Sequence, residues 1–429
     1  MYIYTFITCL LITVLYSFLV YYFTGLIVWA TILSTGAGLV LLGLWLQIYH
    51  STHFAHDPAA DPNSNMEKER IKKGKYVQAG VYAIYGFCGV YFLLLLCLFK
   101  DIAVSVGVLK TSAIIVIRNL RILAMPFFEA LFLVVWILVW ISNFSFLVST
   151  GEITQPSKGS QVKIVTLDQN QKRMVWGQVF MFFWIFEFIQ AFFNYVIIVA
   201  VCTWYFSSTN DTRGDFSLQS GLWWAFRYNS GSLALGSFLL ACIWMVRIIF
   251  EYVDSSLKKS DTEIAKFVTN CVRCCLDCFH RFIKFLNSNA YIQIALTGEN
   301  FCSSAMSAFV LALKNASSFF ITNGIGSLIH LLGKGCIIVA NIFVGFIMLR
   351  FFPEFENGLG SPIAPLAVVG LMSFMLSNVF MGVFSITSLT ILQCLYTDVD
   401  ICNQHKEDPM NNANRPIEME SIVQMIKKH

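Results

Sequence analysis

Long apolar runs separated by short polar stretches dominate this chain. A helix that rises about 1.5 Å per residue crosses a bilayer core of roughly 30 Å in about 20 residues. Eight runs reach that length, at about 2–22, 25–48, 77–98, 126–147, 174–206, 230–252, 325–350 and 366–396. A membrane β-barrel would show short alternating segments instead. The pattern therefore predicts an all-α polytopic membrane helix bundle.

The first two runs are joined by a very short connection near Thr24 and Gly25. Such a short connection predicts two antiparallel neighbouring helices. No positively charged region precedes the first run, so we expect a spanning helix there rather than a cleaved signal peptide.

Three further stretches are apolar but interrupted by polar residues, and each precedes a span. They are 102–123, the LWWAF segment before Ser230, and 298–320. This pattern is typical of amphipathic helices on a membrane surface, with basic side chains toward the headgroups. Residues 253–320 are partly amphipathic and leave the span count open at about eight to ten. We expect a membrane domain at 1–396 and a polar cytoplasmic tail at 397–429.

Composition supports the membrane class and excludes several functions. Hydrophobic residues make up 57% of the 429 residues and charged residues 13%, whereas a soluble chain carries roughly twice that charged fraction. The net charge of +4 gives no indication of nucleic-acid binding, because membrane topology explains basic residues in loops. No phosphate-binding loop, H-E-x-x-H motif or nucleophile elbow occurs, so we expect neither an enzyme, an ATP-driven pump nor a cofactor.

The thirteen cysteines do not indicate a disulfide framework, because many lie inside apolar runs. The CVRCCLDC segment has the i, i+3, i+4, i+7 spacing, at Cys271, Cys274, Cys275 and Cys278. On one continuous helix these thiols share a face and cannot easily surround zinc, so packing or acylation is favoured over a zinc site. The loop 50–75 lacks regular ligand spacing despite its His53, His56, Asp57 and Asp61, and we expect no metal site.

The run at 174–206 carries the candidate chemistry. Glu187, Gln190 and Asn194 are spaced i, i+3, i+7 and therefore share one helical face. A carboxylate that faces lipid costs several kcal/mol, so we expect Glu187 to point into the bundle. Two interpretations stay open: a structural hydrogen bond to a neighbouring helix, or one wall of a solute path.

The second interpretation predicts a site for an organic cation. Aromatic faces beside a carboxylate attract a quaternary ammonium group, which has no hydrogen-bond donor, through cation–π contact and charge. The candidate binding residues are Trp184, Glu187, Asn194, Tyr195, Trp204 and Tyr228.

Six segments in a fixed order carry a resemblance to known proteins. They are EFIQA (187–191), RYNSGSLALGSFLLACIWMVRIIFEYVD (227–254), FIKFLNSNAYIQIALTGENFC (282–302), LLGKGCIIV (331–339), LQCLYTDVD (392–400) and RPIEM (415–419). Together they resemble the choline transporter-like family of solute carriers. The resemblance implies transport of choline, or of ethanolamine and related cations, without ATP. It also implies cytoplasmic amphipathic helices and a loop 50–75 outside, although the basic residues of that loop argue the other way.

The chain departs from this family in three ways. Family members begin with one further span and a large extracellular domain, so we expect either a short member or an incomplete chain. The loop 149–173 is short and has no cysteine. Leu389 precedes Thr390 where many members have an Asp, and the loss of that carboxylate bears on ion coupling.

Two functions follow from these observations. The first is a facilitative or proton-linked carrier of a choline-like cation, integral to the plasma membrane or an organelle membrane. The second is a non-transporting membrane subunit or scaffold, with protein partners in a larger complex. The missing first span and Leu389 favour the second; Glu187 with its aromatic neighbours favours the first.

Overall fold

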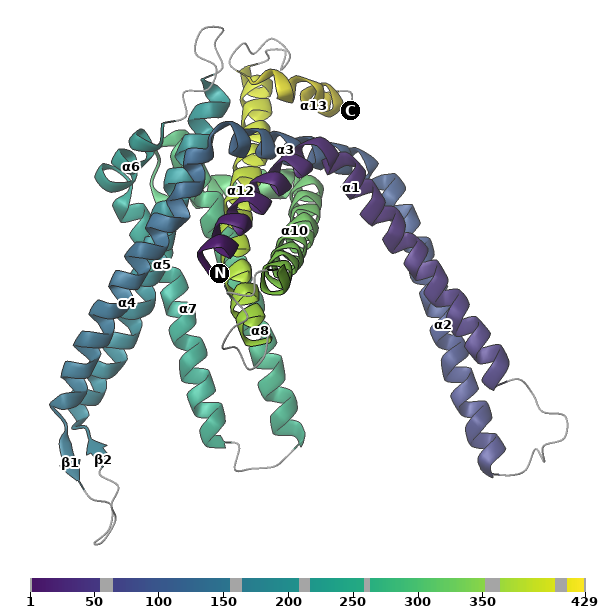
Figure 1. Cartoon of the computed structure of the whole chain (residues 1–429), viewed down its shortest axis with the longest axis horizontal. Helices are drawn as coiled ribbons and strands as arrows, with labels where there is room; N and C mark the ends of the chain where they lie inside the picture. Colours follow the sequence, from purple (N-terminus) through teal and green to yellow (C-terminus); the bar gives the residue numbers. More distant parts are fainter. Residues whose placement is uncertain are drawn as a thin grey trace.

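The computed structural model describes residues 2–54, 65–154, 164–207, 217–257, 263–351, 363–405 and 415–427. Figure 1 shows a bundle made almost entirely of helices. In chain order the elements are α1 (Tyr2–His53), α2 (Asn65–Cys97), α3 (Phe99–Arg118), the 3-10 helix η1 (Leu120–Ala124), α4 (Met125–Ser149), β1 (Glu152–Thr154), β2 (Ile164–Thr166), α5 (Gln169–Phe206), α6 (Leu218–Arg227), α7 (Ser230–Leu257), α8 (Glu263–Thr297), α9 (Phe301–Lys314), α10 (Ala316–Phe351), α12 (Ile363–His405) and α13 (Ile417–Lys427).

The described residues contain seven helices that are long and apolar enough to cross a membrane. A bilayer offers no hydrogen bonds to the backbone, so such segments satisfy their own amides as helices. The predicted all-α polytopic membrane fold is confirmed. The seven helical segments are Phe18–His53, Lys72–Cys97, Leu120–Ser149, Gln169–Phe206, Ser230–Asp254, Ala316–Phe351 and Ile363–Gln404.

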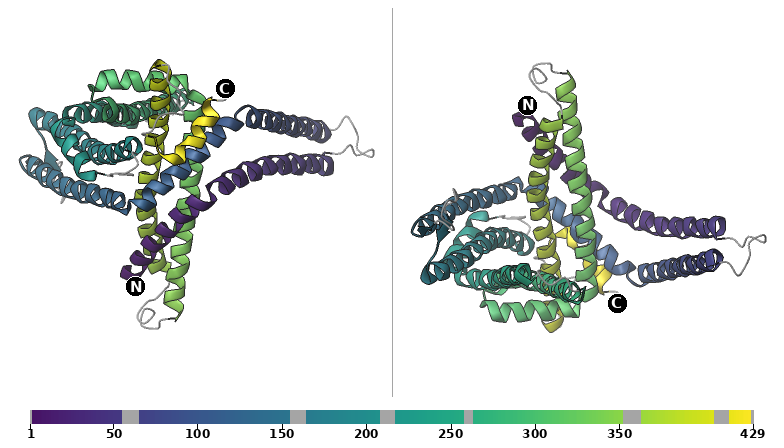
Figure 2. Two further views of the ribbon diagram at one scale, coloured as in Figure 1. Left: turned by 90° about the horizontal axis from the view of Figure 1, so that it is seen from above. Right: turned by 90° about the horizontal axis from the view of Figure 1, so that it is seen from below.

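The first two predicted spans, 2–22 and 25–48, are not an antiparallel pair. They form the single helix α1, within which Thr24 donates its hydroxyl to the Val20 carbonyl and Gly25 keeps helical backbone. A Cβ at Gly25 would lie 3.7 Å from Val106 of α3, so this point is a helix crossing rather than a turn. Beyond it, the second half of α1 runs beside α2 and away from the other helices (Figure 2).

The shorter helices lie near one end of the bundle, where Figure 1 shows α3, α6 and α13. The predicted 102–123 helix is divided into α3 and η1. The predicted 298–320 helix ends at Lys314, and α10 begins two residues later. The open region 253–300 is occupied mainly by α8, one continuous helix in the part that the structure describes.

The core forms where α5 crosses the helices around it. α5 packs against α4, α6, α7, α8 and α12. Its segment from Val196 to Val201 is almost fully buried, as are Ile391 and Leu395 of α12. The two helices are in contact at Cys202 and Cys394, whose sulfur atoms lie 3.7 Å apart. Both helices therefore hold fixed positions, and both contribute side chains to the cavity described next.

Candidate functional site

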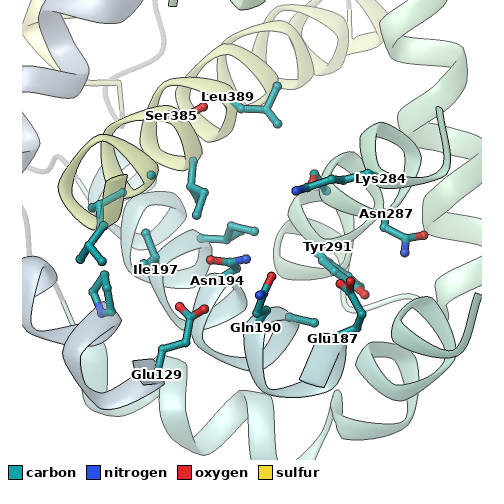
Figure 3. Close-up of a pocket in the computed structure, with 18 of the residues that line it drawn as sticks. Glu129, Glu187, Gln190, Asn194, Ile197, Lys284, Asn287, Tyr291, Ser385 and Leu389 are labelled. Carbon is teal, nitrogen blue, oxygen red and sulfur yellow. The ribbon is translucent and has the colours of Figure 1, made fainter. Parts of the chain in front are cut away.

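A cavity of about 550 Å³ lies between α4, α5, α8, α10 and α12, with a small contribution from α7. Figure 3 shows side chains from several of these helices pointing into the same hollow. Its lining combines two carboxylates with a lysine, a histidine and several amides and hydroxyls: Glu129, Glu187, Gln190, Asn194, Lys284, Asn287, Ser288, Tyr291, His330, Asn378 and Ser385.

Helix α5 supplies one wall of this cavity. It is an uninterrupted helix whose start is closed by a capping box between Asp168 and Gln171. The i, i+3, i+7 spacing brings Glu187, Gln190 and Asn194 to the wall together, as the sequence predicts. Among the described residues, the side chains of Gln190 and Asn194 have no hydrogen-bond partner. Their amides are therefore available to a solute.

Glu187 also makes the interhelical hydrogen bond of the first interpretation. The indole nitrogen of Trp244 on α7 donates to Glu187 Oε1 at 2.9 Å. Phe183 stacks on the Trp244 ring, with 5.7 Å between the ring centroids. The Arg247 guanidinium lies 5.6 Å from that ring, and the His280 ring 5.1 Å. Glu187 therefore makes an interhelical hydrogen bond while it also lines the cavity, and its place on a solute path stays a prediction.

His280 of α8, which lies beside Trp244, is a titratable residue. Burial, reinforced by the charges of Lys284 and Arg247, lowers the pKa of His280 below its ordinary value. The neutral imidazole is therefore favoured at the edge of Trp244.

A second carboxylate, Glu129 of α4, lies on the opposite side of the cavity in Figure 3. It lies one turn after Pro126, the residue that marks the start of α4. Among the described residues it has no hydrogen bond and no ion pair. Glu129 is not among the six residues predicted from the sequence, although an ionisable residue inside an apolar run is a signal of a functional site.

Helix α8 supplies the wall that faces α5. Lys284, Asn287 and Tyr291 repeat the i, i+3, i+7 spacing of the α5 triplet and line the cavity. Asn287 donates to the Gly236 carbonyl of α7 at 2.7 Å, which leaves its Oδ1 without a partner among the described residues. Burial raises the pKa of the Tyr291 phenol, which is therefore neutral. The shared face of these three residues can be predicted from the FIKFLNSNAY segment. Nothing in the sequence predicts that this face lies opposite α5.

Close packing against α7 positions Tyr291. A Cβ at Gly236 would clash with Tyr291 Oη and would lie 3.0 Å from Phe301. Small residues at the start of α7 predict such a close helix approach. Only a glycine leaves room for the phenol at this point.

Four of the six candidate binding residues lie away from the cavity. Trp184 donates to the Ala234 carbonyl of α7 at 3.0 Å. Tyr195 is buried and accepts from Asn229 at 2.9 Å, and Trp204 is buried in the core. Tyr228 is 70% exposed just after α6. Among the described lining residues, Tyr291 supplies the single benzene ring, so these aromatic residues do not form the expected cage around Glu187.

Helices α10 and α12 close the remaining wall. The buried Nε2 atom of His330 has no hydrogen-bond partner among the described residues. Leu389 lies on the cavity wall with Ser385, one turn earlier on α12. The position where the resemblance implies an Asp therefore lies at the site itself, and here it is apolar.

The cysteine row of α8 is not part of this site. Cys271, Cys274, Cys275 and Cys278 are all exposed on one continuous helix. The described residues contain no group of three or more His, Cys, Asp or Glu side chains placed to hold a metal ion. In the loop 50–75, His56, Asp57 and Asp61 lie outside the described residues.

A second hollow, of about 790 Å³, lies on the other face of the α4–α5 pair. Its lining is aromatic and aliphatic, with Gln219 as the one polar residue among those described. A desolvated cation would find no counter-charge there. The polar cavity is therefore the candidate site for a charged solute.

Comparison with known proteins identifies relatives of this chain. Residues 82–400 match the family described as plasma-membrane choline transporter. The Choline transporter-like protein 2 of Dictyostelium discoideum is 28% identical over 397 residues, which cover 91% of this chain and 62% of that protein. Proteins of the same name from Bos taurus and Danio rerio are 34% and 33% identical over 227 and 257 residues. Those regions cover 52% and 58% of this chain, and 32% and 36% of the relatives. The chain thus spans about three fifths of the first protein and about a third of the vertebrate ones.

Proposed function

This chain belongs to the plasma-membrane choline transporter family, and from that premise we propose that it carries choline or a related organic cation across a membrane. The solute passes through the polar cavity between α5 and α8. The observation that carries this proposal is the pair of carboxylates, Glu129 and Glu187, on the wall of a hollow inside a membrane helix bundle. Ionisable residues at such positions are costly and usually serve a solute pathway.

The chemistry of the cavity fits a small organic cation. A quaternary ammonium group has no N–H and cannot donate a hydrogen bond. A carboxylate attracts it through charge alone, so no hydrogen bond is needed. Gln190 and Asn194 offer amides to the hydroxyl group of choline or ethanolamine, and Tyr291 offers one ring face. A volume of about 550 Å³ is within the usual range of small-molecule sites, roughly 300–1,000 Å³.

The energy for transport comes from gradients rather than from ATP. A membrane potential contributes about 2.3 kcal/mol per elementary charge per 100 mV, which drives a cation toward the negative side. Carriage is facilitative or proton-linked, and Glu129, Glu187 and His330 are the titratable cavity residues available for a proton. We place this integral membrane protein in the plasma membrane, and we do not assign it an enzymatic activity.

Uptake of labelled choline into liposomes that contain the purified chain tests this proposal. The wild-type chain should accumulate choline above empty liposomes, and Glu187→Gln should lower the initial rate by on the order of tenfold. Glu152→Gln, which neutralises an exposed glutamate of β1, is the matched control and should leave the rate unchanged. Unchanged uptake in Glu187→Gln removes Glu187 from the mechanism. A wild-type chain that accumulates no choline contradicts carriage and favours the scaffold alternative.

A further inference from the structure

The charged side chains of the cavity come from separate helices. Glu129 lies on α4, Glu187 on α5 and Lys284 on α8, and all three point into the hollow in Figure 3. The titratable groups that face them are His330 of α10 and Tyr291 of α8. The binding tests below use mildly alkaline pH, where free imidazole and phenol groups, with pKa values of about 6.5 and about 10, are uncharged.

Lys284 makes no ion pair with another of the described residues. Among the described residues, no carboxylate lies within ion-pair distance of its ammonium group. On the same helix, by contrast, Arg273 is paired: it contacts Glu251 at 2.7 Å and Asp254 at 3.1 Å. Lys284 is nevertheless close enough for its charge to act on the Glu187 carboxylate across the cavity. Its charge therefore acts on the hollow rather than on one fixed partner.

The charges of the ionised cavity do not cancel. Two carboxylates face one ammonium, so the hollow carries a single uncompensated negative charge. Charge imbalance in a site of low dielectric is unfavourable and is relieved by one bound cation of matching charge. One monovalent cation restores neutrality, whereas a divalent cation leaves an excess positive charge.

We propose that Lys284 sets the charge selectivity of this cavity, acting as a tethered cation that balances one of the two carboxylates and leaves room for one positive charge of the solute. The proposal rests on the proposed function and deepens it by naming the substrate class, which is organic cations of charge +1. Lys284 is a specificity-determining residue, because it rejects dications rather than attracting the substrate.

Two probes of equal size differ only in charge. One carries a trimethylammonium group at one end of a short alkyl chain and a neutral tert-butyl group at the other end, and the second carries a trimethylammonium group at both ends. Binding of each is measured with the purified full chain in detergent, at mildly alkaline pH, and the ratio of the two affinities is the readout. Wild-type protein should favour the monocation.

Lys284→Gln should shift the affinity ratio toward the dication by on the order of tenfold, because a second uncompensated carboxylate then remains. Lys284→Arg keeps the charge and should keep the wild-type ratio. Lys172→Gln, which neutralises an exposed lysine near the start of α5, is the matched control. The double variant Glu129→Gln with Lys284→Gln again leaves one negative charge and should restore preference for the monocation.

The outcomes distinguish this inference from the proposed function. An unchanged ratio in a folded Lys284→Gln protein overturns the role of Lys284, as does a wild-type chain that binds neither probe. If Lys284→Gln does not fold, a Glu129→Gln variant that binds the monocation as tightly as wild type overturns it. A Lys284-dependent ratio without choline uptake in liposomes supports the charge balance and contradicts carriage.

Discussion

Asp398 and Glu129 are both acidic side chains inside the helix bundle, but their surroundings differ. Asp398, near the end of α12, is 2% exposed, accepts from Arg415 Nε at 2.6 Å, and forms an ion pair with Nη2 of the same guanidinium at 2.5 Å. Tyr205 of α5 also donates to it, at 3.2 Å. Glu129 has no such partner among the described residues, and Glu187 accepts only from the neutral indole of Trp244.

The difference separates a structural carboxylate from carboxylates that can bind a solute. A buried charge is tolerated when an opposite charge and hydrogen bonds compensate it, and that compensation then holds the elements together. Burial opposes the charge of Arg415, but Asp398 outweighs this effect and raises the pKa of Arg415 above its ordinary value. The cavity carboxylates lack a paired arginine, so they retain attraction for a mobile cation.

The ion pair between Asp398 and Arg415 also attaches the C-terminal tail to the helix bundle. Arg415 precedes α13, which packs against α3. Thr111 donates to Met419 Sδ at 3.4 Å, and a Cβ at Gly107 would lie 2.5 Å from Ile422. The tail is therefore fixed to α3, α5 and α12 in the described residues, and α5 and α12 also line the cavity.

Among the tests of this comparison, substitution of Arg415 should have the largest effect on stability. Arg415→Met should lower the free energy of unfolding by about 3–5 kcal/mol, because Asp398 is then buried without its counter-charge. The melting temperature of the purified protein in detergent measures the effect. Lys314→Met, which breaks the exposed ion pair of Lys314 with Asp400 at 3.4 Å, is the control and should change the melting temperature little. If Arg415→Met melts like Lys314→Met, Asp398 does not hold the tail to the bundle.

The next test alters the shape of the cavity without changing its charge. Gly236→Ala should destabilise the protein by about 1–3 kcal/mol, because its methyl group collides with Tyr291 and Phe301. Gly231→Ala lies on the same helix with no atom within 4 Å of the new Cβ, so it should be neutral or slightly stabilising. Melting temperatures and choline binding of the two variants give the answer. Equal behaviour would show that the α7–α8 contact does not shape the cavity.

The smallest effect is expected from the hydrogen bond to Glu187. Trp244→Phe keeps the ring beside Phe183 but removes the N–H, and choline affinity should fall by about two- to tenfold with the fold intact. Trp140→Phe removes a similar N–H, which donates to the Gln178 carbonyl at 3.0 Å, away from the cavity. Titration of labelled choline onto both variants measures the difference. Equal affinities would mean that the indole does not orient Glu187.

The class of fold and one wall of the cavity could be predicted from the order of the residues alone. Apolar runs of sufficient length must be helical in a bilayer, because the backbone has no other hydrogen-bond partner there. The 3.6-residue period then fixes which side chains share a face, so Glu187, Gln190 and Asn194 were predictable together. The same rule places Lys284, Asn287 and Tyr291 on one face of another helix, but it does not predict that this face meets α5.

Which helix faces meet depends on how the helices pack against one another. Glu129 reaches the cavity, while Trp184, Tyr195 and Trp204, on the same helix as Glu187, turn toward α7 or the core. Thr24 and Gly25 lie inside α1 because contact with α3 favours a continuous helix there. Asp398 and Arg415 stand in motifs that the sequence displays, yet their pairing depends on where α12 ends and the tail returns. Local periodicity fixes directions within one helix, whereas contacts between helices depend on packing angles and depths that arise only when the whole chain is assembled.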